Sequence, residues 1–449
     1  MDYGKEPELT GRIVIPGDPQ YDSARKEFNT FFDKYPLVIV FAQETQDVVN
    51  AVRWALNRKV PIRMRSGRHN YEGLSVVNAG IVIDVSEMTQ LEIDYESGIA
   101  TLGTGWRNVA LTETLGSKGF VVPTGICATP AIAGLTLGGG HSILSRTWGL
   151  TQDHLLELEM VSANGRVIRA NANNHSDLFW ASRGGGGGNF GICTSFRFRT
   201  HHIETVGFAE ISWDLQDLKS VLRVWQDYTL PDADNRLTTT LFMSKGVEPN
   251  LLMQGVFLGS SRELRRLLEP LLRAGSPLTV TIEDMPWVEV APLVYARNPS
   301  TPLPFKSVGP YVYDLLPEKA LNTIERFINE SPLNNTTSVL FHGLNGAVAK
   351  IPNRATAYFY RKALSNMTLF ATWSRPEGAA PGIRWVEDFR REMIPFTKGV
   401  YVNTPDLSIK NWPAAYYGSN FDRLTRVKAK YDPKNVFSFP QSIPPARFI

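Results

Sequence analysis

Three glycine-rich segments in the first 200 residues constrain the fold of this chain more than any other feature. They occupy residues 65–73, 124–141 and 183–191. Glycine allows a backbone to turn sharply and to lie against a ligand, and its N–H groups can face an anion. Because the three segments are far apart in the sequence, they predict a ligand longer than a mononucleotide, such as a dinucleotide lying across one domain.

The glycine pattern differs from two common nucleotide-binding loops. A Rossmann fingerprint joins one strand to one helix, whereas the five glycines at 184–188 lead into a predicted strand at 192–198. No Lys-Ser or Lys-Thr pair follows any glycine run, which argues against a P-loop. The ligand is therefore expected to bind in another way.

Composition excludes several classes of protein. The net charge is +3, from 47 basic and 44 acidic residues, and no block of like charge marks a nucleic-acid or membrane surface. No apolar run approaches the roughly 20 residues of a membrane span, and the N-terminus lacks a signal-peptide pattern. Two cysteines are too few for a disulfide scaffold. We expect a cytoplasmic protein with no nucleic-acid or membrane partner.

Short strands and helices alternate up to about residue 200. The apolar run 37–41 predicts a buried strand, and the helical period over 45–57 predicts a helix capped by Thr45. The segment 158–170 predicts a hairpin, because Asn164-Gly165 is a strong tight-turn signal.

The pattern changes after His202. Predicted strands such as 208–213 and 251–258 alternate with amphipathic helices, and glycine clusters become rare. The segment 260–273 predicts one helix, which begins with a capping box formed by Ser260 and Glu263. The last segment, from residue 403, predicts a structured return of the chain.

Six motifs, in this order and spacing, carry a resemblance to a known family. They are RSGRHNYEG from residue 65, GICATPAIAGLTLGGGHSILSRTWGLTQDHLL from 125, RGGGGGNFGI from 183, YVNTPD from 401, AYYGSNFDRL from 415 and YDPKNVFSFPQSIPP from 431. The set resembles the berberine-bridge-enzyme-like flavoproteins of the vanillyl-alcohol-oxidase superfamily of FAD enzymes. Any single motif would be a weak signal, whereas the ordered set is specific.

The resemblance implies an α+β fold of two domains. Residues 1–202 would form the N-terminal part of an FAD-binding domain of the PCMH or vanillyl-alcohol-oxidase type. Residues 203–400 would form a substrate domain built on an antiparallel sheet. Residues 401–449 would return to the FAD domain, and the active site would lie between the domains.

The resemblance also implies FAD attached at two points. His69 matches the histidine that bonds the flavin 8α-methyl group, and the alternative is a loop histidine that only contacts a phosphate. Cys127 matches the cysteine that bonds carbon 6 of the flavin. The alternatives for Cys127 are a buried free thiol or a disulfide with Cys193, which a reducing compartment disfavours.

Other cofactor contacts are expected along the glycine loops, and no metal site is expected. Arg68 stands where the family usually has glycine, so its side chain either reaches a phosphate or points into solvent. Backbone N–H groups of the first loop are expected to hold the pyrophosphate. The expected cofactor-contact residues, besides His69 and Cys127, are Arg65, Ser66, Gly67, Arg68, Asn70, Gly73, Gly125, Thr129, Gly134, Gly138, Gly139, Gly140, Asp153, Asn189, Gly191, Ile192 and Asn403.

Catalytic candidates come from two segments. Tyr416 or Tyr417 matches the family's general base, and we predict Tyr416, because adjacent residues of an extended chain point in opposite directions. His141 stands where the family often has tyrosine, and we expect it near the substrate with a pKa of about 6–7. The alternatives are packing tyrosines and a structural histidine. Pro130 replaces a small or branched residue near the family's oxygen path, which makes reactivity with oxygen an open question.

The resemblance implies oxidation of an alcohol or hemiacetal, of oligosaccharide or secondary-metabolite type. A hydride would pass to the flavin, and dioxygen would reoxidise it with release of peroxide. The alternatives are a dehydrogenase with another acceptor, an amine oxidase and a non-catalytic coat or structural flavoprotein. The expected partners are a small-molecule substrate and dioxygen, and the sequence does not indicate an oligomeric state.

Overall fold

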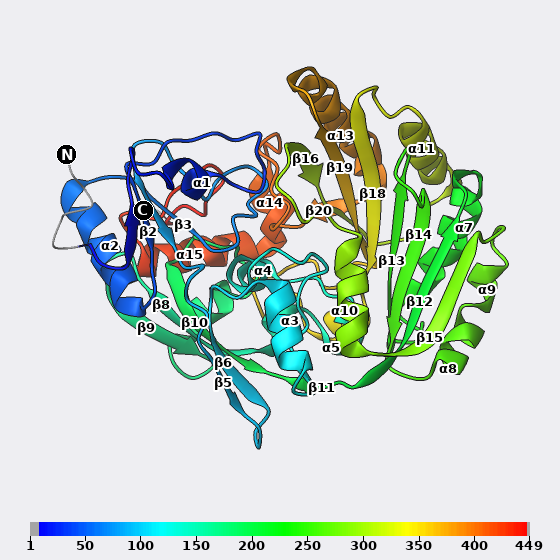
Figure 1. Cartoon of the computed structure of the whole chain (residues 1–449), viewed down its shortest axis with the longest axis horizontal. Coiled ribbons are helices and arrows are strands. Elements are labelled where there is room, and N and C mark those ends of the chain that lie inside the picture. Colours follow the sequence, from blue (N-terminus) through cyan, green and yellow to red (C-terminus); the bar gives the residue numbers. More distant parts are fainter. Residues whose placement is uncertain (1–8, 447–449) are drawn as a thin grey trace.

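The computed structural model describes residues 9–446, which form two halves lying side by side. Figure 1 shows one half built from the N-terminal part of the chain together with the last helices, and the other half built from the middle of the chain. The α+β class and the antiparallel sheet in the middle of the chain are confirmed. The exact domain boundaries at residues 202 and 400 stay a prediction.

The N-terminal half begins with a four-stranded sheet in the order β1-β2-β4-β3. Strands β2, β4 and β3 are parallel, and β1 pairs antiparallel with β2. Near-continuous apolar sequence in β2 and β4 is typical of parallel strands buried on both faces. The elements are β1 (Arg12–Val14), α1 (Tyr21–Arg25), β2 (Val38–Phe41), α2 (Thr45–Arg58), β3 (Ile62–Arg65) and β4 (Ile81–Asp84).

A five-stranded antiparallel sheet completes this half, in the order β5-β6-β10-β8-β9. Its predicted hairpin is confirmed, because β8 pairs antiparallel with β9 across the Asn164-Gly165 turn. The strands are β5 (Leu91–Asp94), β6 (Ile99–Gly103), β8 (Leu155–Val161), β9 (Val167–Asn171) and β10 (Ile192–Arg199). The helices and the short pair beside it are α3 (Asn108–Gly116), α4 (Ile132–Gly138), α5 (Ser145–Trp148), α6 (Ser176–Ala181), β7 (Phe120–Val121) and β11 (His201–His202).

The second half is a nine-stranded sheet in the order β15-β12-β14-β13-β18-β19-β17-β20, with β16 also pairing to β19. Every pairing in it is antiparallel. Its strands are β12 (Thr205–Trp213), β13 (Leu237–Ser244), β14 (Leu251–Phe257), β15 (Thr279–Pro286), β16 (Phe305–Val308), β17 (Pro310–Val312), β18 (Asn335–Gly343), β19 (Ser365–Trp373) and β20 (Lys398–Val400).

Helices cover one face of this sheet and leave the other facing the N-terminal half (Figure 1). Contacts of α7, α11 and α13 with β13, β18 and β19 bury an apolar layer between helices and strands. The helices of this half are α7 (Leu218–Trp225), α8 (Ser261–Leu267), α9 (Glu269–Leu272), α10 (Trp287–Ala296), α11 (Glu318–Asn329), α12 (Ala347–Lys350) and α13 (Ala379–Met393). Of these, α10 lies on the other face, toward the β15 edge of the sheet, where it also contacts α3. The uncovered face is therefore available to line a site.

The C-terminal segment returns to the N-terminal half. Helices α14 (Trp412–Tyr417) and α15 (Phe421–Tyr431) follow β20, and α15 packs against α6. The buried Lys428 ammonium on α15 donates to the Asn189 carbonyl at 2.6 Å, to the Phe437 carbonyl at 2.7 Å and to the Asp432 carboxylate at 2.8 Å. The last segment is thus bound to the third glycine loop.

Three local expectations are wrong. Glu44, not Thr45, caps α2, in a reciprocal capping box with Asp47. The segment 260–273 is two helices, α8 and α9, because Pro270 lacks the N–H that a continuous helix needs, although the Ser260 capping box is confirmed. The pair 416–417 ends helix α14 and is not extended, so the alternation argument for Tyr416 does not apply.

Candidate active site

A cavity of about 670 Å³ lies between the glycine loops and the uncovered face of the nine-stranded sheet. All three glycine-rich segments contribute to its wall, together with the segments around Tyr401 and Tyr416. Sequence-predicted residues on its wall are Arg65, Ser66, Gly67, Arg68, His69, Asn70, Gly125, Cys127, Gly134, His141, Asn189, Gly191, Ile192, Asn403, Tyr416 and Tyr417.

Two glycines leave a narrow slot in this wall. A Cβ added at Gly134, within α4, would meet no protein atom within 4 Å, although the residue lines the cavity. A Cβ added at Gly187 would meet only the Gly134 Cα, at 3.8 Å. Side chains at these positions would extend into the cavity and would not contact the rest of the protein. The slot therefore suits a flat or extended ligand lying against bare backbone.

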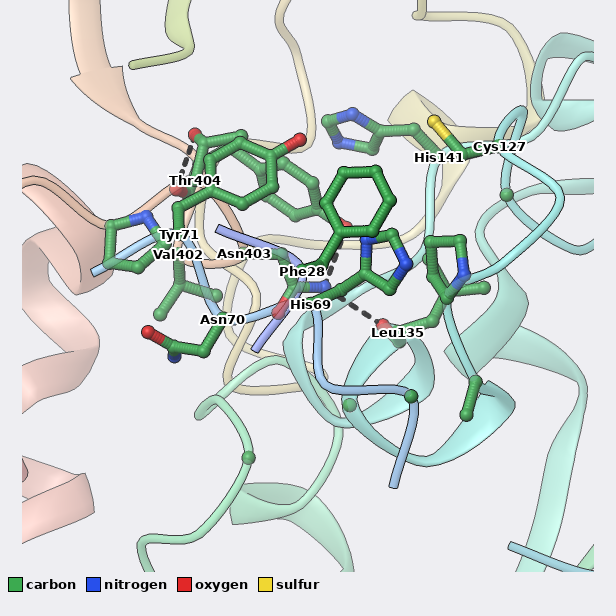
Figure 2. A pocket seen from close by; sticks show the side chains of 18 of the residues that line it. Phe28, His69, Asn70, Tyr71, Cys127, Leu135, His141, Val402, Asn403 and Thr404 are labelled. Atoms are coloured by element: carbon green, nitrogen blue, oxygen red, sulfur yellow. Dashed lines mark hydrogen bonds between the residues drawn. The ribbon is translucent and has the colours of Figure 1, made fainter. Parts of the chain in front are cut away.

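His69 lies in the first loop with its ring held on two sides. Phe28 stacks on the imidazole with ring centroids 3.9 Å apart, as Figure 2 shows. The Nε2 atom is 2.8 Å from the Thr129 hydroxyl. Burial, helped by the nearby Arg107 cation, lowers the pKa of His69 to about 3. The imidazole is therefore neutral, with Nε2 engaged and Nδ1 without a partner in the described chain.

Cys127 lies in the second loop, on the cavity wall. The Asn108 amide donates to the Cys127 carbonyl at 2.9 Å and holds the loop backbone in place. Burial raises the pKa of the Cys127 thiol to about 12, so the thiol is protonated. Cys127 and Cys193 are both free, which removes the disulfide alternative in this structure.

The first loop is supported by buried charges. The Arg65 guanidinium donates to Asp84 at 2.6 Å, to Glu27 and to the Ala24 carbonyl, and its side chain is fully buried among these groups. Arg68 adopts a left-handed backbone with φ of 64°, a conformation that glycine adopts without strain. Its side chain donates to the Ser23 carbonyl at 3.0 Å. Both arginines thus position the loop through protein contacts.

Tyr401, which follows β20, joins the C-terminal segment to the second glycine loop. Its hydroxyl oxygen accepts hydrogen bonds from the Gly140 N–H and from the Asn403 amide, both at 2.9 Å. Asn403 also donates to the Leu135 carbonyl, a bond drawn in Figure 2. A Cβ at Gly138 would collide with the Asn403 side chain, so this contact requires glycine.

Tyr416 and Tyr417 both reach the cavity wall, and both hydroxyls are bound to protein. The Tyr416 hydroxyl donates to the Gln441 amide oxygen at 2.9 Å and accepts from the Asp406 N–H. The Tyr417 hydroxyl donates to the Gly185 carbonyl at 3.0 Å. Burial raises the pKa of each tyrosine above its usual range.

His141 lies in an aromatic cluster at the cavity. Its ring stacks on Tyr401 with centroids 3.9 Å apart, and its Nε2 is 3.0 Å from the Tyr358 hydroxyl. Burial, with His342 beside it, lowers the pKa of His141 well below its usual range. The expected pKa of 6–7 is wrong, because burial disfavours the cation and the neighbouring His342 adds to that effect.

Several predicted cofactor contacts lie behind the wall and support it. Asp153 accepts two hydrogen bonds from Arg361, at 2.7 and 2.8 Å, in a pair that is almost fully buried. Gly73 packs against the Phe32 ring. Gly139 packs against Tyr358, while Gly138 and Gly140 make the contacts with Asn403 and Tyr401 described above.

The structure brings to the cavity a set of side chains that we did not predict. Phe28 stacks on His69, and Tyr71 also lines the cavity. Tyr358, behind the wall, binds His141. The face of the nine-stranded sheet adds uncharged polar side chains to the cavity wall. Their alternation along β18 is a sequence pattern from which they could have been predicted. The polar sheet residues on the wall are Thr240, Gln254, Thr336, Ser338, His342, Asn366, Thr368 and Thr372.

Comparisons with known proteins agree with this arrangement. A family described as FAD binding domain matches residues 36–171, and one described as berberine and berberine like matches residues 400–444. YgaK of Bacillus subtilis, an uncharacterised FAD-linked oxidoreductase, is 41% identical over 445 residues and 98% of each chain. Berberine bridge enzyme-like 24 of Arabidopsis thaliana is 30% identical over 86% of this chain and 79% of that protein.

The chain belongs to the berberine-bridge-enzyme-like family of FAD-linked oxidoreductases. The solved structure of Physcomitrella patens BBE-like 1 has a TM-score of 0.90 and 29% identity, and the match covers 97% of both chains. FAD is therefore the cofactor of this family member, and the protein is an enzyme.

The residues present fit FAD. Gly134 and Gly187 present bare backbone to the cavity, against which a flat ring system can lie, and the glycine loops provide further exposed backbone along the cavity. Among residues 9–446, no group of three or more His, Cys, Asp or Glu is placed to hold a metal ion. Nor does any helix of that range have the length and apolar character to cross a membrane.

Proposed function

We propose that this FAD-linked oxidoreductase oxidises a C–OH group of an uncharged, hydroxylated small molecule. The observation that supports it is a single cavity with bare glycine backbone on one side and neutral polar side chains on the other. Bound FAD supplies a hydride acceptor, and dioxygen then takes the electrons and gives peroxide. An oligosaccharide or a secondary-metabolite alcohol has the required chemistry.

Covalent attachment of FAD through His69 and Cys127 is part of this proposal. His69 is neutral, and its Nδ1 has no partner among residues 9–446, so that nitrogen can offer its lone pair to a carbon. Cys127 lies on the same cavity wall and is not in a disulfide. Because its pKa is raised, its thiol has to lose a proton before it can bond.

The charged side chains on the cavity wall already have partners of opposite charge, which favours an uncharged substrate. Arg297 lines the cavity and pairs with Glu210, while Arg65 and Arg68 lie beside Asp84. A charged substrate that binds one of these side chains would have to break its existing ion pair. The free energy of that ion pair would then be lost. Hydroxyl groups on the substrate can instead bind the threonine, serine and amide side chains of the sheet.

The substrate has to lose a hydroxyl proton as well as a hydride. Tyr416 as the base stays a prediction, and its hydroxyl would have to release Gln441 to act. His141 is neutral and can exchange hydrogen bonds with a bound hydroxyl. Its Nε2 is held by Tyr358, which leaves Nδ1 for that contact.

Anaerobic mixing with a panel of substrates tests this function. Oligosaccharides and alcohols of secondary-metabolite type should bleach the flavin band, whereas amines and carboxylic acids of similar size should not. Admission of air should restore the band with one peroxide per turnover. Slow recovery in air with fast recovery by an artificial acceptor would identify a dehydrogenase, and bleaching by amines alone would contradict the proposal.

A further inference from the structure

The loop that carries Cys127 has no regular secondary structure, so its shape depends on groups outside it. The three consecutive carbonyls of residues 126–128 each accept a hydrogen bond from another element. In that order, the donors are the Asn298 amide at 2.9 Å, the Asn108 amide at 2.9 Å and the Val109 N–H at 3.0 Å. The backbone on both sides of Cys127 is therefore fixed from outside the loop.

These donors come from both halves of the molecule. Asn108 and Val109 begin α3 in the N-terminal half, whereas Asn298 follows the end of α10 in the other half. Figure 1 shows α3 and α10 side by side where the two halves meet, and the two helices contact each other. The loop of Cys127 thus lies between a helix of its own half and a helix of the half that carries the nine-stranded sheet.

Tyr295, in the last turn of α10, makes a second contact with this loop. Its hydroxyl oxygen is 2.7 Å from that of Thr112 and 3.2 Å from that of Thr124, and the two threonine oxygens are 3.1 Å apart. Thr112 belongs to α3, and Thr124 is the first residue of the second glycine-rich segment. Each hydroxyl can donate once and accept once within this triangle. Burial raises the pKa of Tyr295, so its hydroxyl keeps the proton that the triangle needs.

The end of α10 is in turn bound to the nine-stranded sheet. The Gln254 amide on β14 donates to the Leu293 carbonyl at 3.2 Å and to the Glu210 carboxylate at 2.8 Å. Glu210, on β12, also pairs with Arg297 just after the helix. Gln254 and Arg297 line the cavity. The sheet that faces the cavity therefore also supports the second glycine loop.

The two neighbours of Cys127 pack toward α10. Ile126 and Ala128 contact the buried apolar cluster that includes Val294 and Tyr295 of that helix. The Cys127 side chain lies on the cavity wall, as Figure 2 shows. A shift of α10 would therefore move the loop and, with it, the sulfur.

We propose that α10 sets the position of the Cys127 sulfur, with Asn298 and Tyr295 as positioning residues for its bond to the flavin. Joining the sulfur to a ring carbon removes the thiol hydrogen and the hydrogen of that carbon as two protons together with two electrons, and dioxygen takes both as peroxide. A misplacement of about 1 Å can slow such a step by on the order of 100-fold. This inference rests on the proposed covalent attachment.

Two variants of nearly unchanged shape test this with a count of free thiols. The chain has two cysteines, so the denatured wild type with Cys127 attached should titrate one thiol, that of Cys193. Asn298→Asp removes the N–H donor, and Tyr295→Phe removes the hydroxyl. Both variants should titrate close to two thiols, with the Cys127 flavin peptide reduced by on the order of tenfold or more. The His69 flavin peptide should be unchanged, because Phe28, outside this loop, holds that ring.

Tyr228→Phe is the matched control. Tyr228 lies in the same half as α10, and its hydroxyl donates to the Leu267 carbonyl at 2.9 Å, away from the cavity wall. This variant should titrate one thiol and keep both flavin peptides. If the two variants at the end of α10 also keep both peptides, or lose both to the same extent, α10 does not position the sulfur and the inference is overturned.

Failure of the proposed attachment gives a different result. If the denatured wild type titrates two thiols, Cys127 is not attached, and that part of the proposed function fails. Alkylation of the native protein by iodoacetamide then still tests the position of the free Cys127 thiol. The rate should be higher by on the order of tenfold in Asn298→Asp, because a loosened loop exposes the thiol, and unchanged in Tyr228→Phe. Equal rates in all three proteins would overturn the inference on their own.

Discussion

At the scale of single residues, His69 and Cys127 are the positions where the cavity can bond a cofactor. Each belongs to a different loop, although His69 contacts Thr129 in the loop of Cys127, whose own carbonyl accepts from Asn108. The two attachments would nevertheless be separate covalent bonds. Loss of one attachment should leave the other intact.

The single variants His69→Ala and Cys127→Ala should each retain FAD after acid precipitation, because one covalent bond remains. The double variant should release all of it. Peptide mapping by mass spectrometry would locate each attachment. Cys193→Ala is the matched control, since Cys193 is also free but lies in β10, and it should retain both bonds. Complete release of FAD from the denatured wild type would exclude covalent attachment.

At the scale of elements, helix α4 and the segment after it form one wall of the cofactor slot. The helix carries Gly134 facing open cavity and ends at Gly138, where Asn403 packs. Alanine at the two positions should therefore act in opposite ways on the protein. The methyl group added at Gly134 would enter the open cavity, whereas the methyl group added at Gly138 would collide with the Asn403 side chain.

Gly134→Ala should leave the apoprotein folded and raise its unfolding free energy by up to about 1 kcal/mol, because alanine favours a helix interior. FAD incorporation should fall, since the methyl occupies the slot. Gly138→Ala should lower the unfolding free energy as well as FAD incorporation. Urea denaturation of apoprotein and the flavin-to-protein absorbance ratio would measure both. Full FAD loading of Gly134→Ala would show that the cofactor does not use this slot.

At the scale of the whole molecule, buried Lys428 joins the C-terminal return to the third glycine loop. Lys428→Met should lower the unfolding free energy by about 3–5 kcal/mol, because the Asp432 charge stays buried without its cation. Lys430→Met is the control on the same helix. Its pair with Asp177 is exposed, and the loss should be below about 1 kcal/mol. Equal losses of unfolding free energy in the two variants would show that Lys428 does not hold the C-terminal return against the third glycine loop.

Three buried histidines should make the fold acid-sensitive. Burial lowers the pKa of His154 and His342 to about 4 and holds that of His141 well below its usual range, whereas histidine in the unfolded chain titrates near 6.5. Their neutral forms stabilise the fold above pH 6.5, and this stability is lost as pH falls below it. Each histidine should contribute about 1.4 kcal/mol per pH unit. Urea midpoints from pH 7 to 5 would measure this, and His342→Gln should reduce the slope.

The local sequence was sufficient to predict features that depend on neighbouring residues. The Asn164-Gly165 hairpin, the Ser260 capping box and the strand after the third glycine loop follow from turn chemistry and periodicity. The ordered motifs were also sufficient to identify the family, because each motif carries a local backbone requirement. The cap of α2 and the break at Pro270 were missed, because competing local signals lie within a turn of each other.

Only the tertiary structure decided which side chains are free to react. Tyr401 is hydrogen-bonded to Gly140, which is 261 positions away in the sequence, and Lys428 is hydrogen-bonded to Asn189, which is 239 positions away. The pKa of His141 depends on burial and on His342, which is far away in the chain. Hydrogen bonds and desolvation act between atoms brought together by packing, so a sequence can place reactive residue types in a segment without determining their protonation or their partners.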